Sequence, residues 1–121
     1  MVVSRDAEAR KALWEHHGRQ PFVLEAPVTL TFCSDWHRMT RWTKLRGADP
    51  GYDNLKAWIT GQQDAVIAAQ NAAVACEVLG LGICYMGTTL WAMDKISEDL
   101  ELPEVMRNAL FPFECVNTIL F

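Results

Sequence analysis

The sequence predicts an α+β fold: a mixed α/β layer in which helices flank a β-sheet and one long helix occupies the centre. Residues 28–33 alternate apolar and polar side chains with the period of two that is typical of a half-buried strand. Residues 62–79 form a long alanine-rich helical stretch, and a glycine follows it, as is common just past a helix end. Residues 83–86 and 115–121 are short apolar runs that predict two further strands.

Length and composition predict a single domain over residues 1–121. Hydrophobic residues make up 50% of the chain and charged residues 21%, which is typical of a globular protein and argues against disorder. A chain of this size buries roughly two-thirds of the surface that it exposes when unfolded. The net charge of −4 disfavours non-specific binding to nucleic acid, so we expect no nucleic-acid partner.

The N-terminal third predicts a helix, a connector and a strand. Residues 6–17 form a helical pattern with Ser4 as the expected N-cap, and Gly18 ends it. Residues 20–25 contain a proline and predict a connector that leads into the strand. Residues 34–53 are the least regular part of the chain, and some of them are compatible with a helix.

The long helix is expected to begin at about Leu55, because Asp53 or Asn54 can serve as its N-cap. Gly61 lies inside this helix. Glycine has a low helix propensity, so we expect a break or a kink at that position.

The C-terminal third predicts one more helix before the last strand. Thr88 or Thr89 can cap this helix, which then runs to about Leu100. Residues 104–110 predict a short helical turn, and residues 115–121 predict the final strand.

The cysteines predict reduced thiols in a cytoplasmic protein. They lie in apolar segments without CxxC spacing, a pattern that fits neither a disulfide framework nor a zinc site. Charged residues near the N-terminus interrupt any apolar run, so we expect no signal peptide. Polar residues within 62–79 argue against a membrane span. The three histidines form no ligand set, and we expect no metal. The four cysteines are Cys33, Cys76, Cys84 and Cys115.

Residues 36–46, WHRMTRWTKLR, combine basic and aromatic side chains. Such a segment could bind the phosphate of a nicotinamide cofactor or cover an aromatic substrate. Arginines interleaved with aromatic residues also occur in proteins that bind single-stranded nucleic acid. The remaining interpretation is a solvated amphipathic stretch whose tryptophans reach into the core.

The turn after the strand at 83–86 is the candidate binding site, formed by Tyr85, Met86, Gly87 and Thr88. A glycine-containing turn can present backbone N–H groups to a bound group and stabilise negative charge on it. The alternative is that Gly87 only supplies a tight connection between the strand and the next helix. No side chain is paired with a base as an activated nucleophile, so we expect no catalytic side chain.

Several segments in a fixed order resemble the central part of the flavin-dependent nitroreductase family. The pattern AxxAAQN followed by GLGxCYxG lies within residues 65–87. EAPVTLTFC precedes it at residues 25–33, and DKISEDLELPE follows it at residues 94–104. With the apolar strand at the C-terminus, the resemblance spans residues 2–121.

The resemblance implies an FMN-dependent oxidoreductase of the nitroreductase type. Such an enzyme transfers hydride from NAD(P)H through FMN to a small electron acceptor, such as a nitroaromatic or a quinone. It also implies that Tyr85, Met86, Gly87 and Thr88 border the flavin and that helix 62–79 forms the seam of a homodimer. Residues 36–46 are then a candidate lid over the substrate.

The sequence departs from the family pattern at both ends. The family usually begins with an arginine-rich RSxRxF-like segment and continues past the last strand with a Gly-x-Pro turn and a basic segment. These elements bind the flavin phosphate and the ribityl chain, and this sequence contains neither of them. The chain is therefore expected to be a partial domain with weakened FMN binding. The alternative is an inactive nitroreductase-fold module for dimerisation or binding, which does not hold FMN tightly.

Overall fold

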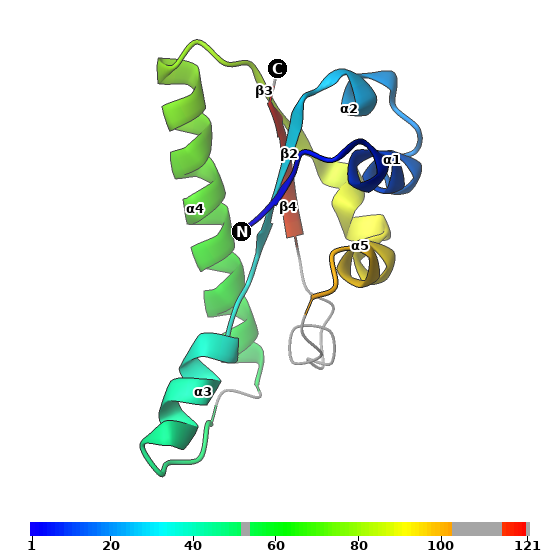
Figure 1. The fold of residues 1–121 in the computed structure, drawn as a ribbon. Coiled ribbons are helices and arrows are strands. Elements are labelled where there is room, and N and C mark those ends of the chain that lie inside the picture. Colours follow the sequence, from blue (N-terminus) through cyan, green and yellow to red (C-terminus); the bar gives the residue numbers. More distant parts are fainter. Residues whose placement is uncertain (52–53, 103–114, 121) are drawn as a thin grey trace.

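A computed structural model of the chain describes residues 1–51, 54–102 and 115–120 (Figure 1). The predicted α+β fold with a long central helix is confirmed, whereas the turn predicted at 104–110 lies outside the described residues. In chain order the elements are β1 (Val2–Ser4), α1 (Ala7–His16), α2 (Pro21–Glu25), β2 (Val28–Cys33), α3 (His37–Leu45), α4 (Leu55–Val78), β3 (Ile83–Met86), the 3-10 helix η1 (Gly87–Trp91), α5 (Met93–Asp99) and β4 (Cys115–Leu120).

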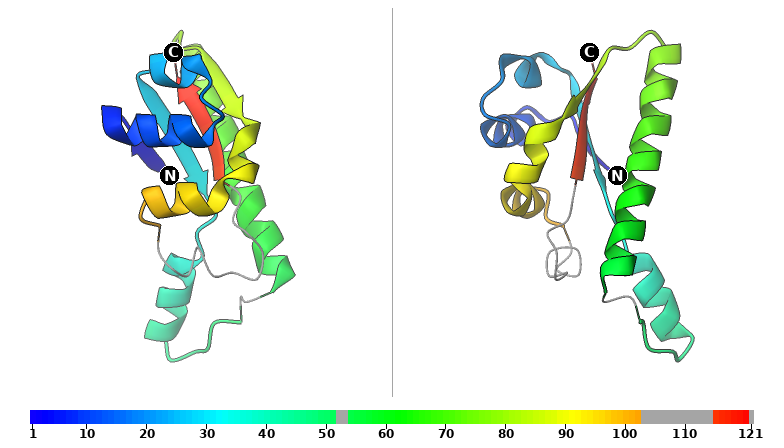
Figure 2. Two further views of the ribbon diagram at one scale, coloured as in Figure 1. Left: turned by 90° about the vertical axis from the view of Figure 1, so that its right-hand side faces the viewer. Right: turned by 180° about the vertical axis from the view of Figure 1, so that it is seen from behind.

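The described strands form one antiparallel sheet in the order β1-β2-β4-β3. The last strand lies in the middle of the sheet, where Val28 of β2 and Ile83 of β3 both pair with Leu120. Helix α4 covers one face of the sheet, and α1, α2, η1 and α5 lie over the other face (Figures 1 and 2). None of the helices in the described ranges is both long enough and apolar enough to cross a lipid bilayer.

Strand β2 is buried on both of its faces, which differs from the half-buried strand that its alternation predicts. Leu30 and Phe32 pack against Ala65 and Ala69 of α4. The intervening Thr29 has no exposed surface, and neither has Thr31. The helical layer on the far face of the sheet covers these threonines, and a pattern of alternating polarity could not reveal that layer.

Helix α4 is continuous through Gly61, so the predicted break is wrong. A Cβ atom at Gly61 would lie 2.9 Å from Ser34 Cβ and 2.9 Å from Trp36 Nε1. The glycine therefore allows the segment after β2 to approach the helix closely, and this packing outweighs the low helix propensity of glycine.

We expect the substitution Gly61→Ala to destabilise the protein by about 1–3 kcal/mol, because an added methyl group forces Ser34 or Trp36 to move. The free energy of unfolding in urea measures this effect. Gly87→Ala is the matched control, since a Cβ there meets nothing within 4 Å. Equal stability of the two variants would contradict the close-approach explanation.

The predicted end of α4 is confirmed in detail. Gly80 has φ = +76°, and its N–H donates to the carbonyl of Glu77. The N–H of Leu81 donates to the carbonyl of Cys76 at 2.9 Å. Together these bonds form the Schellman motif, in which glycine is favoured because it adopts a positive φ without strain.

The N-cap predicted for α1 is wrong, whereas one of the two N-caps predicted for α4 is confirmed. Ser4 was predicted to cap α1, and this is wrong, because Ser4 pairs with Thr29 as the last residue of β1. The cap is Asp6, whose side chain accepts hydrogen bonds from the N–H groups of Glu8 and Ala9. For α4, Asn54 is the N-cap and accepts from the N–H of Ala57.

Two further predictions about helices are wrong. Residues 20–25 were predicted to be a connector, but Pro21 begins helix α2, a position where its missing N–H costs nothing. The single helix predicted from Thr88 or Thr89 to Leu100 is divided at Ala92 into η1 and α5. Neither threonine hydroxyl caps a helix. The Thr88 hydroxyl is hydrogen-bonded to His17, the residue after α1, and Thr89 donates to the carbonyl of Met86.

Candidate functional site

The candidate site is the Gly87 turn, which we define as residues 85–88, where β3 ends and η1 begins. Adjacent side chains of β3 point to opposite faces of the sheet. The Tyr85 hydroxyl donates to Gln70 Oε1 of α4 at 3.0 Å. Met86 is buried on the other side with Val23 and Ala26. Because the Met86 side chain is buried, Met86 can offer a ligand only its backbone groups.

Burial raises the pKa of Tyr85, and the nearby negative charge of Glu77 raises it further. The phenol is therefore neutral at physiological pH and is a hydrogen-bond donor. Its bond to Gln70 fixes β3 against α4 beside the turn.

Gly87 lies on the exposed side of the turn. A Cβ built on it meets nothing within 4 Å, and its φ lies outside the left-handed region. Neither backbone strain nor packing among the residues that the structure describes therefore requires a glycine at this position. The open space over the backbone is suited to a bound group that approaches the main chain closely, and this property fits the edge of a flavin ring.

Hydrogen bonds of two side chains hold the Gly87 turn from its inner side. His17, which follows α1, has no exposed surface, and its Nδ1 lies 2.7 Å from Thr88 Oγ1. Thr89 is equally buried, and its hydroxyl donates to the Met86 carbonyl at 2.7 Å. The turn is thus fixed internally while Gly87 stays open.

The histidine in this arrangement is neutral at physiological pH. Burial, and to a lesser extent repulsion from His16, together lower the pKa of His17 to about 4. A neutral imidazole has one donor nitrogen and one acceptor nitrogen, so Nδ1 can accept a hydrogen bond from the Thr88 hydroxyl. The sequence pattern indicated no metal site for the histidines and gave no sign of this hydrogen-bonding role.

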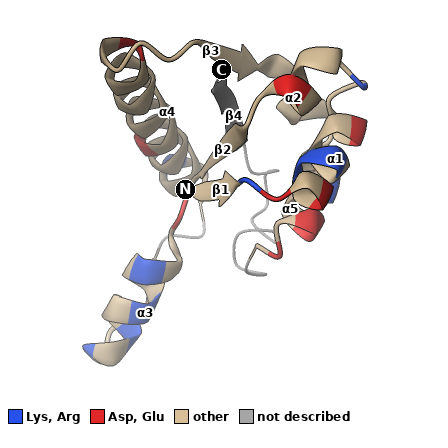
Figure 3. Ribbon diagram, turned by 45° about the horizontal axis from the view of Figure 1, so that its top comes forward, with Lys and Arg blue, Asp and Glu red and all other residues tan. Residues whose placement is uncertain are grey.

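The basic segment 36–46 forms helix α3, which extends away from the sheet and from the Gly87 turn (Figures 1 and 3). Trp36 Nε1 donates to the carbonyl of Ala57 at 2.9 Å and joins the segment to α4. Trp42, by contrast, is 53% exposed, and the Arg46 guanidinium lies 5.3 Å from its ring centre. One tryptophan of this segment thus packs inward and the other faces solvent. Helix α3 does not cover the turn of its own chain.

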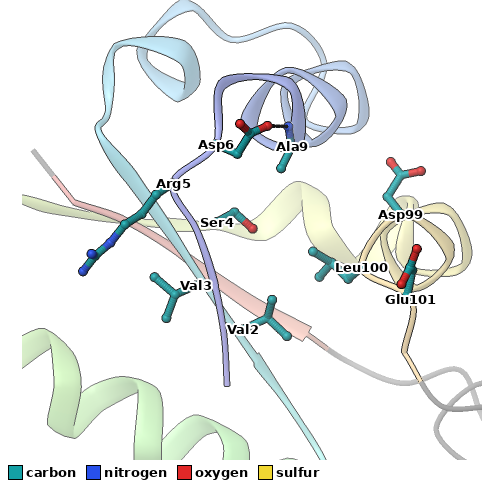
Figure 4. Close-up of a pocket in the computed structure, with 9 residues that line it drawn as sticks. All are labelled: Val2, Val3, Ser4, Arg5, Asp6, Ala9, Asp99, Leu100 and Glu101. Carbon is teal, nitrogen blue, oxygen red and sulfur yellow. Dashed lines mark hydrogen bonds between the residues drawn. The ribbon is translucent and has the colours of Figure 1, made fainter.

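An open cleft of about 640 Å³ lies between β1, the start of α1 and the end of α5 (Figure 4). Its charged lining consists of Arg5 and the carboxylates of Asp6, Asp99 and Glu101. The carboxylates outnumber the arginine, so the cleft disfavours an anionic group such as a flavin phosphate.

A second open cleft of about 440 Å³ borders η1 and includes His16 and Trp91. The Gly87 turn lines neither of these two clefts. Within the described residues, no cluster of three or more His, Cys, Asp or Glu side chains could hold a metal ion.

Solved structures share this arrangement of sheet and helices. An oxidoreductase structure from Bacteroides fragilis NCTC 9343 superposes with a TM-score of 0.89 at 39% sequence identity and covers 98% of this chain. The chain therefore has the α+β fold of these solved structures.

The family model named Nitroreductase family matches residues 2–113, and the chain belongs to the nitroreductase family. A Bacillus subtilis (strain 168) protein named FMN reductase (NADPH) is 33% identical over 101 residues. A protein from Pseudomonas sp. (strain G-1) named CR(VI) reductase is 40% identical over 99 residues.

The chain corresponds to only part of these relatives. Each of the two sequence matches covers 82% of this chain but 41% of the relative. The structural match covers 46% of the Bacteroides protein. The chain thus spans less than half the length of the relatives that it matches.

Proposed function

We propose that this protein is an FMN-dependent oxidoreductase that uses NAD(P)H as its electron donor. The observation that carries the proposal is the Gly87 turn, which is fixed from inside and open above the glycine. It belongs to a nitroreductase-family chain, and a relative at 33% identity is named an NADPH-dependent FMN reductase. We also propose that the protein is cytoplasmic, because its cysteine pattern is typical of reduced thiols.

In this proposal the backbone of Gly87 and Thr88 would hold the edge of the flavin ring, with Tyr85 and Met86 bordering it. When bound, FMN would supply the hydride chemistry, taking hydride from a nicotinamide and passing it to a nitroaromatic or quinone-like acceptor. The chain's own contribution is to bind the ring, to orient it and to offer backbone donors for negative charge. No side chain of this chain is assigned a covalent step.

An FMN titration of the purified protein tests the proposal, with visible absorption and flavin fluorescence as readouts. We expect saturable binding at micromolar FMN or below, and bleaching of the bound flavin when NADPH or NADH is added. No binding up to millimolar FMN by the folded protein would support the alternative, a nitroreductase-fold module that does not hold FMN tightly.

We also propose that the protein is a homodimer that associates through α4. The side of this helix that faces away from the sheet carries apolar residues that are 42–82% exposed. An exposed apolar patch of this kind is typical of an interaction surface. Its members are Ile59, Val66, Ile67, Val74 and Val78.

We expect the double substitution V66E/V74E to raise the dimer dissociation constant about a hundredfold or more, because the interface would bury unpaired carboxylates. Sedimentation velocity over a range of protein concentrations measures it. The control is Leu24→Glu, an exposed leucine on α2. A wild-type monomer, or an unchanged dimer in the double variant, would contradict this interface.

A further inference from the structure

His17 is fixed in place by the way in which α1 ends. Its own N–H donates to the carbonyl of Leu13, and its carbonyl accepts from Gln20 Nε2 at 3.0 Å. The following Gly18 has φ = +66°, and the N–H of Arg19 donates to the carbonyl of Trp14. These bonds close the end of the helix and hold in place the backbone that carries the imidazole.

From this position the imidazole reaches a residue 71 positions further along the chain, at the start of η1. Thr88 is partly buried, and its hydroxyl lies 2.7 Å from His17 Nδ1. A threonine side chain is β-branched and has few rotamers, so fixing its hydroxyl also restrains the backbone to which it is attached. The restrained backbone includes the peptide group that joins Gly87 to Thr88.

We propose that His17 is a positioning residue for the flavin: its bond to Thr88 holds the Gly87–Thr88 peptide in the orientation that binds the flavin ring. This inference rests on the proposed function. A donor that is already oriented before the ligand arrives loses less entropy on binding, and a turn that can move binds more weakly. The neutral state of the buried imidazole supports this role, because it keeps an acceptor nitrogen available to the threonine.

The experiment measures the FMN dissociation constant and the visible spectrum of bound FMN for a set of variants. His17→Leu removes both ring nitrogens, and Thr88→Val removes the hydroxyl at nearly constant volume. We expect each to weaken FMN binding about tenfold, since one hydrogen bond contributes roughly a decade of affinity at most. The double variant should lose about the same tenfold, because both changes remove one shared bond.

Two further variants separate positioning from a general effect on structure. His17→Asn places an amide atom near the position of Nδ1, and we expect it to restore affinity to within about threefold of the wild type. His16→Asn is the matched control, because the ring of His16 bonds to Asp99 and not to the Gly87 turn. We expect no change in FMN affinity for this control.

The outcomes are distinguishable. If the wild type binds FMN and both His17→Leu and Thr88→Val keep its affinity and spectrum, His17 is only structural and the inference is overturned. Independent tenfold losses that multiply in the double variant would overturn it as well. If the wild type does not bind FMN, the proposed function fails first and the inference fails with it. Should His17→Leu not fold, Thr88→Val alone decides.

Discussion

We expect the substitution Gly87→Val to weaken FMN binding about a hundredfold, enough to abolish retention of the flavin, and to leave the fold intact. A Cβ at Gly87 meets no atom of the described residues within 4 Å, and its φ lies outside the left-handed region, so a side chain can be added there without a close contact at its first carbon. The valine side chain would instead occupy the volume that the flavin edge needs. A loss of about 3 kcal/mol of binding energy corresponds to a weakening of about a hundredfold.

Two measurements check this prediction together: the FMN dissociation constant and the free energy of unfolding. Gly51→Val is the matched control, because a Cβ at Gly51 also meets nothing within 4 Å. That control should bind FMN as the wild type does. Gly87→Ala should give an intermediate loss, because its methyl group is smaller. An unchanged flavin content in the Gly87→Val variant would contradict the assignment of the flavin site to this turn.

The sequence predicted those elements whose signal is local. The period of two in residues 28–33 identified β2, and the alanine-rich run followed by Gly80 identified the end of α4. Both patterns depend only on residues that are close in sequence. The alternation of a strand and the glycine at a helix end are each visible within a few neighbouring residues.

Predictions failed where a contact between distant residues decided the outcome. Gly61 looked like a helix break, but Ser34 and Trp36 approach it closely, and nothing in the local sequence indicates that contact. Ser4 had the chemistry of an N-cap but was already paired with Thr29 in the sheet. In both cases tertiary packing outweighed local propensity.

In the candidate site, too, the feature set by neighbouring residues was predicted and the feature set by a distant contact was not. The position of the Gly87 turn followed from the strand and the glycine, but its internal anchor did not, because His17 lies 71 residues away from Thr88. A histidine directly before the helix-ending Gly18 was the available signal. It indicates that the imidazole lies at a helix end, but not which element it meets.

We expect the buried His17 to make the protein less stable as the pH falls from about 6.5 to about 4. Burial lowers the pKa of His17 to about 4 in the folded protein, whereas the unfolded chain has the ordinary value of 6.5. Between these values the unfolded state binds a proton that the folded state excludes, so the free energy of unfolding rises with pH. The contribution is complete above about pH 6.5 and is lost by about pH 4.

The loss attributable to His17 is about 3 kcal/mol, since each unit of pKa shift corresponds to about 1.4 kcal/mol. Carboxylates titrate in part of this range, so the measured quantity is the difference between wild type and His17→Asn in urea unfolding at several pH values. Asparagine does not titrate, and the variant should lack this part of the pH dependence. His16→Asn should retain most of it, because burial is the larger cause of the lowered pKa and His17 stays buried in that variant. Parallel stability curves for wild type and His17→Asn would mean that the imidazole is as readily protonated in the fold as in the unfolded chain.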